Sequence, residues 1–202
     1  ARSTACTGSS SGAGRWSMFY YGNTPDHRVL RAESADLHRW ERSASSAPGG
    51  RDPFLLRVGA LWYLYSVGAD EHREIGQIVV SQSRDLLRWT MPTVALTAPV
   101  ATFGWGNLES PVVVPRGEEF YLFVTRTSDS PHDYARTMVF ASTDPTRFVW
   151  EPVTEIMAHA AEVIEDGGGW FITSAGWTAR MGERWRGLSI APLAWAPRAS
   201  LR

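Results

Sequence analysis

The sequence predicts an all-β protein built as a β-propeller, and three observations support this. Short runs rich in β-branched and aromatic residues are separated by turn residues, and no long stretch has an apolar helical period. A glycine turn followed by an aromatic strand recurs about every 50 residues, at Gly14, Gly59, Gly117 and Gly167. The phrase Ser-x-Asp-Leu-x-x-Trp closes the outer part of the first two repeats. A repeat of this length, made of short strands, is typical of a propeller blade.

Each blade buries its faces only against its neighbours, so the repeats are expected to form one domain over 1–202. Four repeats are visible, at about 1–48, 49–98, 107–153 and 157–198. The alternative is a β-sandwich with coincidental spacing. A sandwich, however, gives no reason for the repeated Ser-x-Asp-Leu-x-x-Trp phrase.

The elements of each repeat follow a common order. Residues 1–14 read as a weak strand or loop, and the later inner strands lead into their glycine turns at 51–58, 109–116 and 159–164. Aromatic strands follow the turns at 16–21, 61–65, 120–125 and 170–172. Matching third strands are expected at 29–32, 76–81 and 137–142. In the closing phrase, Asp36 and Asp85 are expected to form turns, and Trp40, Trp89 and Trp150 to lie in the blade core.

Composition and charge exclude several classes of partner and cofactor. The net charge is −1 with no basic patch, which argues against nucleic acid or a membrane surface as a partner. No apolar run is long enough to span a membrane, and the single Cys6 forms no internal disulfide. No histidine spacing suits a metal, and no motif suits a cofactor, so neither is expected. Secreted and cytoplasmic locations both remain open, as does the oligomeric state.

Three polar residues stand where inner strands begin. Asp52, Glu109 and His159 precede their glycine turns by seven or eight residues. Equivalent positions of neighbouring blades converge on the mouth of a propeller's central channel, so these side chains should face one another. Two carboxylates beside an imidazole suit the hydrolysis of a glycoside, in which one carboxyl protonates the leaving oxygen. Trp105 and Trp177, in loops at the same rim, are candidates for stacking on a sugar ring.

Three segments resemble the five-bladed β-propeller glycoside hydrolases of families 32 and 43, which act on fructosides, arabinosides and xylosides. They are Arg51-Asp52-Pro53, Glu109-Ser110-Pro111 and His159-Ala160-Ala161-Glu162-Val163. The resemblance implies that Glu109 is the general acid and that Asp52 orients the substrate, stabilises the transition state or tunes the acid. It also implies that His159 positions or polarises the acid, and that Arg51 contacts substrate. The carbohydrate is then the expected ligand.

The sequence departs from that family in two ways. An ungapped alignment of the first blade places Ala5 where the family has the aspartate that acts as nucleophile or base, and the first carboxylate of the chain is Asp26. Four repeats are visible, whereas the family has five. The sequence therefore predicts a glycoside hydrolase-like protein that acts on or binds furanosides or pentosides. The alternatives are a catalytically inactive propeller that binds a carbohydrate or a protein, and a purely structural propeller.

Overall fold

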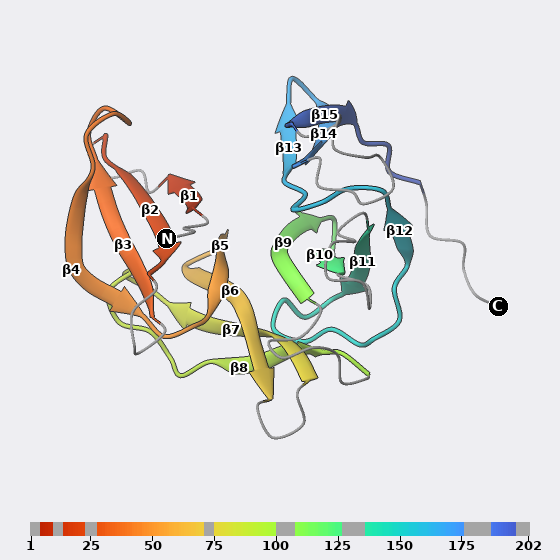
Figure 1. The fold of residues 1–202 in the computed structure, drawn as a ribbon, viewed down its shortest axis with the longest axis horizontal. Coiled ribbons are helices and arrows are strands. Elements are labelled where there is room, and N and C mark those ends of the chain that lie inside the picture. The colour runs from red at the N-terminus through yellow and green to blue at the C-terminus, as the bar shows by residue number, and fades with distance from the viewer. Residues whose placement is uncertain are drawn as a thin grey trace.

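The computed structural model contains four antiparallel β-sheets that follow one another along the chain and are arranged around a common centre (Figure 1). It describes residues 14–22, 28–70, 75–99, 108–126, 136–175 and 187–196, and the backbone of 5–9. No helix occurs among these residues, so none of them forms a helix that could cross a membrane. The prediction of an all-β fold is confirmed.

In every sheet the strands lie in chain order, and the first strand is the innermost (Figure 1). The first sheet contains β1 (Ala5–Ser9), β2 (Trp16–Tyr21), β3 (Val29–Ser34) and β4 (Glu41–Ala47). The second contains β5 (Arg51–Val58), β6 (Leu61–Asp70), β7 (Ile75–Ser83) and β8 (Thr93–Thr97). The third contains β9 (Leu108–Arg116), β10 (Glu119–Arg126), β11 (Arg136–Ser142) and β12 (Thr154–Ile156). The fourth contains β13 (Val163–Asp166), β14 (Gly169–Ser174) and β15 (Ser189–Pro192).

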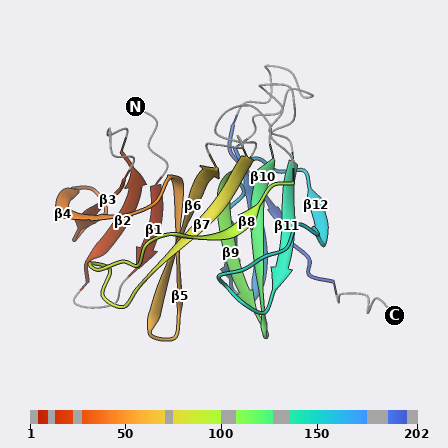
Figure 2. The same ribbon diagram turned by 90° about the horizontal axis from the view of Figure 1, so that it is seen from below.

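Tight turns with left-handed glycines connect the inner strand of a sheet to the next strand. Gly59 and Gly117 have φ of 58° and 62°, a conformation that only glycine adopts without steric cost. The β5–β6 and β9–β10 hairpins lie at the same end of the molecule (Figure 2). The starts of β5 and β9 therefore lie at the opposite end.

Three apolar clusters hold neighbouring sheets together. The first joins Phe19 and Val29 of the first sheet to the second sheet, and the largest joins the second sheet to the third. The third cluster joins the third sheet to the fourth, where the Trp195 ring packs edge-on against Trp170 at a centroid distance of 5.5 Å. Phe54, on the inner strand of the second sheet, packs against all three clusters. None of the clusters, as described, joins the first sheet to the fourth.

The fourth sheet accordingly has one covered face and one open face. Ile172 points to the third sheet and is 7% exposed. Ile164 and Ile190, which lie on the opposite face of the sheet, are 43% and 63% exposed. The ring of sheets is thus open between the fourth sheet and the first (Figure 1).

The repeated Ser-x-Asp-Leu-x-x-Trp phrase forms the same turn twice. The Asp36 carboxylate accepts hydrogen bonds from the backbone N–H groups of His38 and Arg39, at 2.9 and 2.8 Å. Asp85 does the same for Leu87 and Arg88. These bonds lower the pKa of both carboxyl groups from the ordinary value. The expectation that both aspartates form turns is confirmed.

The tryptophans that end this phrase differ in their environments. Trp40 donates its indole N–H to the carbonyl of Leu37 and is not part of the clusters described above. Trp89 packs edge-on against Phe19 of the first sheet, with ring centroids 6.0 Å apart, and Trp150 packs against the largest cluster. The expectation of a core position therefore holds for Trp89 and Trp150 and is wrong for Trp40, which closes its own turn instead.

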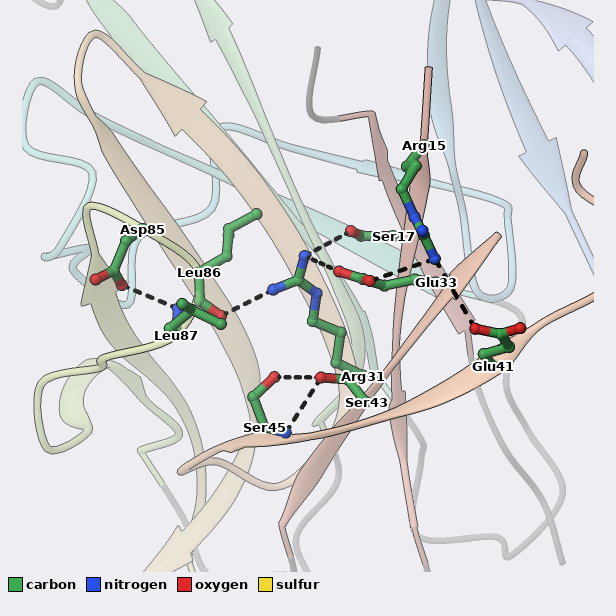
Figure 3. A network of polar contacts seen from close by, with 10 residues as sticks. All are labelled: Arg15, Ser17, Arg31, Glu33, Glu41, Ser43, Ser45, Asp85, Leu86 and Leu87. Atoms are coloured by element: carbon green, nitrogen blue, oxygen red, sulfur yellow. Dashed lines mark hydrogen bonds and ion pairs between the residues drawn. The ribbon is translucent and has the colours of Figure 1, made fainter. Parts of the chain in front are cut away.

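A buried arginine supplements the apolar contact between the first two sheets (Figure 3). Arg31, 9% exposed, donates hydrogen bonds to Glu33 at 2.5 Å, to Ser17 at 3.1 Å and to the Leu86 carbonyl at 3.4 Å. Leu86 belongs to the turn of the second sheet and has a left-handed φ of 61°. The turn at Ser83–Trp89 thus serves as an attachment point for the first sheet.

Candidate functional site

A residue in the left-handed conformation lies near the start of three inner strands. Asp52, Ser110 and Ala160 have φ of 54°, 51° and 48°. A left-handed φ costs a non-glycine residue about 1–2 kcal/mol. Each of the three lies seven residues before its turn glycine, which makes them structurally equivalent. Strain that recurs at one place in a fold points to positions where it serves a purpose.

This equivalence shifts the expected register by one residue. The expectation was that Asp52 corresponds to Glu109 and His159. In the structure Asp52 corresponds to Ser110 and Ala160, whereas Glu109 and His159 correspond to Arg51. Strand pairing supports this equivalence, because each inner strand gains one residue at the same place, between Arg51 and Phe54 in β5 and between Glu109 and Val112 in β9.

Arg51 and Glu109 form an ion pair between the second and third sheets. Arg51 Nη1 lies 2.8 Å from Glu109 Oε1, and the two side chains are 27% and 19% exposed. Gly50, the residue before Arg51, lets the backbone pass close to strand β6, because a Cβ atom at Gly50 would lie 1.8 Å from the carbonyl oxygen of Val67. The close backbone contact at Gly50 thus fixes the position of Arg51, while both side chains of the ion pair remain partly exposed to solvent.

Asp52 connects the same two sheets through the backbone. Its Oδ2 accepts a hydrogen bond of 3.0 Å from the N–H of Ser110, the residue after Glu109. Asp52 therefore contributes to holding the start of β9 in position, besides supplying a carboxylate to the site.

His159 lies in a short connection before β13 and is partly buried. Burial lowers the pKa of its imidazole from the ordinary value, and the negative charge of Asp52 partly opposes this effect. The structure thus brings Arg51, Asp52, Glu109 and His159 to one rim, where inner strands of three sheets begin. Carboxylates, a guanidinium and an imidazole can together accept hydrogen bonds from sugar hydroxyls and donate them to sugar oxygens.

Two predicted site residues lie outside the described residues, and the predicted first-blade position needs a correction. They are Trp105 and Trp177. In the first sheet Cys6 pairs with Phe19, three residues after Trp16. In the second sheet Phe54 pairs with Tyr65, three residues after Trp62. Cys6 is therefore the structural equivalent of Phe54. The match to Asp52 is then Thr4, outside the described residues, rather than Ala5. Neither residue is acidic.

Ser110, Ala160 and Thr125 are site residues that the sequence did not suggest. The seven-residue spacing to the glycine is the signal that could have identified the first two. Thr125 Oγ1 accepts a hydrogen bond of 2.9 Å from the N–H of Ala160. A threonine in a strand otherwise reads as an ordinary β-former.

A surface hollow of about 490 Å3 lies away from this rim. Its lining includes Leu61, Arg84, Arg88 and Trp89, at the hairpin end of the second sheet. Among the described residues no group of histidine, cysteine, aspartate and glutamate is placed to hold a metal ion. The four predicted residues that the structure places at the rim, Arg51, Asp52, Glu109 and His159, supply hydrogen-bonding and charged groups.

Comparison with known proteins identifies the fold. No family profile and no curated protein sequence matches the chain. A family 32 β-fructofuranosidase from Bombyx mori matches 92% of the chain, with 14% sequence identity and a TM-score of 0.66. The match covers 46% of the Bombyx mori protein, so the chain spans about half of its length.

Two bacterial proteins give similar matches. An endo-1,4-β-xylanase from Bacteroides thetaiotaomicron has a TM-score of 0.73 at 17% identity, over 94% of this chain and 70% of its own. A family 43 enzyme from Xanthomonas citri, solved with xylotriose, has a TM-score of 0.66 at 14% identity, over 95% and 68%. The chain therefore has the β-propeller fold of the family 32 and family 43 glycoside hydrolases, and its described residues form four sheets, whereas that fold has five blades.

Proposed function

We propose that the rim formed by Arg51, Asp52, Glu109 and His159 binds a furanoside or pentoside unit of a carbohydrate. The observation that carries this proposal is the Arg51–Glu109 pair, which spans two sheets, is held next to Asp52 and remains accessible to solvent. A pair of this kind presents both donors and acceptors to vicinal hydroxyl groups. Xylotriose and sucrose in structures of similar proteins support the same class of ligand.

In a hydrolytic reaction, Glu109 would give its proton to the leaving oxygen. Arg51 is bound to Oε1, so Oε2 is the oxygen that would carry this proton. Asp52, on the neighbouring strand, would support the positive charge that develops on the sugar ring. His159 would lie at the edge of the same sugar, since its imidazole is close enough to Asp52 to interact electrostatically with that carboxylate.

Binding without turnover is a second candidate, favoured by the sequence of the first repeat. Glycoside hydrolysis requires a nucleophile or a water-activating base in addition to the acid. No aspartate or glutamate precedes Asp26, so the inner strand β1 contributes no carboxylate. The second candidate predicts sugar affinity without hydrolysis.

Calorimetry with sucrose, fructo-, arabino- and xylo-oligosaccharides tests the proposal. We expect saturable binding to one of these classes, and a loss of more than about tenfold in affinity in Glu109→Gln, because a hydrogen bond to a charged group contributes about 1.5–3 kcal/mol. The matched control is Glu118→Gln in the β9–β10 turn at the opposite end, where affinity should not change.

Hydrolysis assays on the same sugars separate the two candidates. The binding-only candidate predicts no turnover by the unaltered protein and measurable turnover in Thr4→Asp or Ala5→Asp. Turnover by the unaltered protein that disappears in Glu109→Gln favours the hydrolase. Absence of binding to every sugar, in a protein folded by circular dichroism, contradicts both and leaves a role in protein binding or structure.

A further inference from the structure

The segment that carries His159 lies outside the strands, yet its backbone is held at almost every group. The His159 N–H donates to Ser174 Oγ at 3.0 Å, and the His159 carbonyl accepts from the N–H of Ala175 at 2.8 Å. The Ala158 N–H donates to the carbonyl of Ile156 at 3.0 Å. The fourth sheet thus holds His159 itself on one side of the segment.

Two buried threonines of the third sheet hold the other side. The Ala160 N–H donates to Thr125 Oγ1 at 2.9 Å, and Thr137 Oγ1 donates to the Ala158 carbonyl at 2.9 Å. The two hydroxyl oxygens are 3.2 Å apart. Thr137 has used its only proton on the carbonyl, so Thr125 must donate to Thr137. A chain of three hydrogen bonds, called the hydroxyl relay below, therefore runs from the Ala160 N–H through Thr125 and Thr137 to the Ala158 carbonyl. Its two ends lie on either side of His159.

The strand itself does not require a hydroxyl at this place. Thr125 lies opposite Glu109, as Val67 lies opposite Arg51 in the second sheet, and both residues are fully buried. A valine therefore fits the equivalent position of a neighbouring sheet. The hydroxyl of Thr125 serves the left-handed residue Ala160, just as Asp52 serves the left-handed Ser110.

We propose that Thr125 and Thr137 are positioning residues for His159: their hydroxyl relay fixes the left-handed turn at Ala160 and so holds the imidazole beside Asp52. The inference rests on the proposed function only in treating His159 as part of the sugar site. It assigns a role in the site to two residues that contact no ligand themselves.

The first test is NMR of the unaltered protein and of Thr125→Val. In the unaltered protein the Ala160 amide should exchange slowly with solvent, although it lies outside any strand ladder. In Thr125→Val we expect its exchange to accelerate at least about tenfold, since the N–H loses its acceptor. The His159 titration midpoint should also move up towards the ordinary value of about 6.5 as the imidazole becomes more accessible. His159→Gln identifies the resonance among those of the five histidines.

Three variants control for effects on folding alone. Thr125→Ser keeps the hydroxyl and should restore both the slow exchange and the midpoint. Thr137→Val keeps the acceptor of the Ala160 N–H but removes the donor to the Ala158 carbonyl, so it should move the His159 midpoint in the same direction as Thr125→Val. Thr90→Val removes a threonine hydroxyl that also accepts from a backbone N–H at 2.9 Å, but in the connection before β8, and should leave His159 unchanged.

The relay is refuted if Thr125→Val is folded and leaves both the Ala160 exchange and the His159 midpoint unaltered. Should Thr125→Val not fold, rapid exchange of Ala160 in the unaltered protein, or a displaced midpoint in Thr125→Ser, refutes it instead. Sugar affinity is measured in parallel and should fall in Thr125→Val. A protein that binds no sugar but shows the NMR effects contradicts the proposed function and supports the relay.

Discussion

Arg31 offers the sharpest test of how the first sheet is attached to the second (Figure 3). Replacing it by alanine removes two short hydrogen bonds, to Glu33 and Ser17, and a longer one of 3.4 Å to the Leu86 carbonyl. It also removes the contact of the guanidinium with the Phe19 ring, 5.8 Å from its centroid. Arg31→Ala is therefore expected to destabilise the protein.

The size of the effect follows from burial. Removing one partner of a fully buried ion pair costs about 3–5 kcal/mol. The Glu33 side chain is 33% exposed and retains Arg15 at 3.7 Å, so the lower end of that range applies. We expect a loss of about 3 kcal/mol, which for a chain of this size lowers the melting temperature by about 6–12 °C. Arg31→Met, which keeps an apolar stem over Phe19 and avoids burying a charge, should lose about 1–2 kcal/mol.

Urea unfolding followed by tryptophan fluorescence measures these losses, with Arg136→Ala as the control. Arg136 pairs with Glu155 at 2.8 Å within one sheet, and both side chains are more than 40% exposed. Such a surface pair contributes about 0–1 kcal/mol. Hydrogen exchange should also accelerate in β2 and β3 more than in β10 and β11. A loss in Arg31→Ala no larger than that in Arg136→Ala would refute the reasoning.

Three further predictions concern the rest of the fold. Trp195→Ala should lower the free energy of unfolding, measured in urea, by about 2–3 kcal/mol, because the ring is packed among aromatic side chains. Trp195→Phe should lower it by less than about 1 kcal/mol, since the indole Nε1 has no acceptor among the described residues. Ala160→Gly should stabilise by about 0.5–1 kcal/mol because it relieves a left-handed φ, whereas Ala161→Gly at the next position should destabilise by a similar amount. The lowered pKa of His159 disfavours the protonated native state, so stability should fall as pH drops from about 6.5 towards that lowered pKa, and pH-dependent unfolding of His159→Gln should lack this component.

The sequence predicts the architecture because its main determinants are local. Left-handed glycines such as Gly59 and Gly117 mark the hairpins, and the Asp36 and Asp85 turns are closed by hydrogen bonds within three residues. Local signals of this kind can be read without knowing the fold. Their regular spacing then predicts a ring of similar sheets.

The register of the site could not be predicted in the same way. The chemically reactive side chains lie seven residues (Asp52) or eight residues (Glu109, His159) before the glycines, and only the backbone conformation and strand pairing show that the positions seven residues before are the equivalent ones. The three left-handed residues, Asp52, Ser110 and Ala160, share no side-chain property that would identify them. The threonine hydrogen bonds also cannot be recognised in the sequence, because Thr125 lies in the third sheet and Ala160 in the connection before the fourth, 35 residues further along.

A common physical problem explains why the rim is built as it is. A left-handed residue near the start of an inner strand turns its N–H out of the strand's own ladder, and a backbone N–H near the core needs an acceptor. At Ser110 the acceptor is the carboxylate of Asp52, and at Ala160 it is the hydroxyl of Thr125, in each case from the preceding sheet. The residue just before each left-handed position, Glu109 or His159, is thereby fixed relative to the neighbouring sheet. The same bonds that join the sheets therefore set the geometry of the groups that face a ligand, so the stability of the inter-sheet contact and the precision of the site are expected to change together.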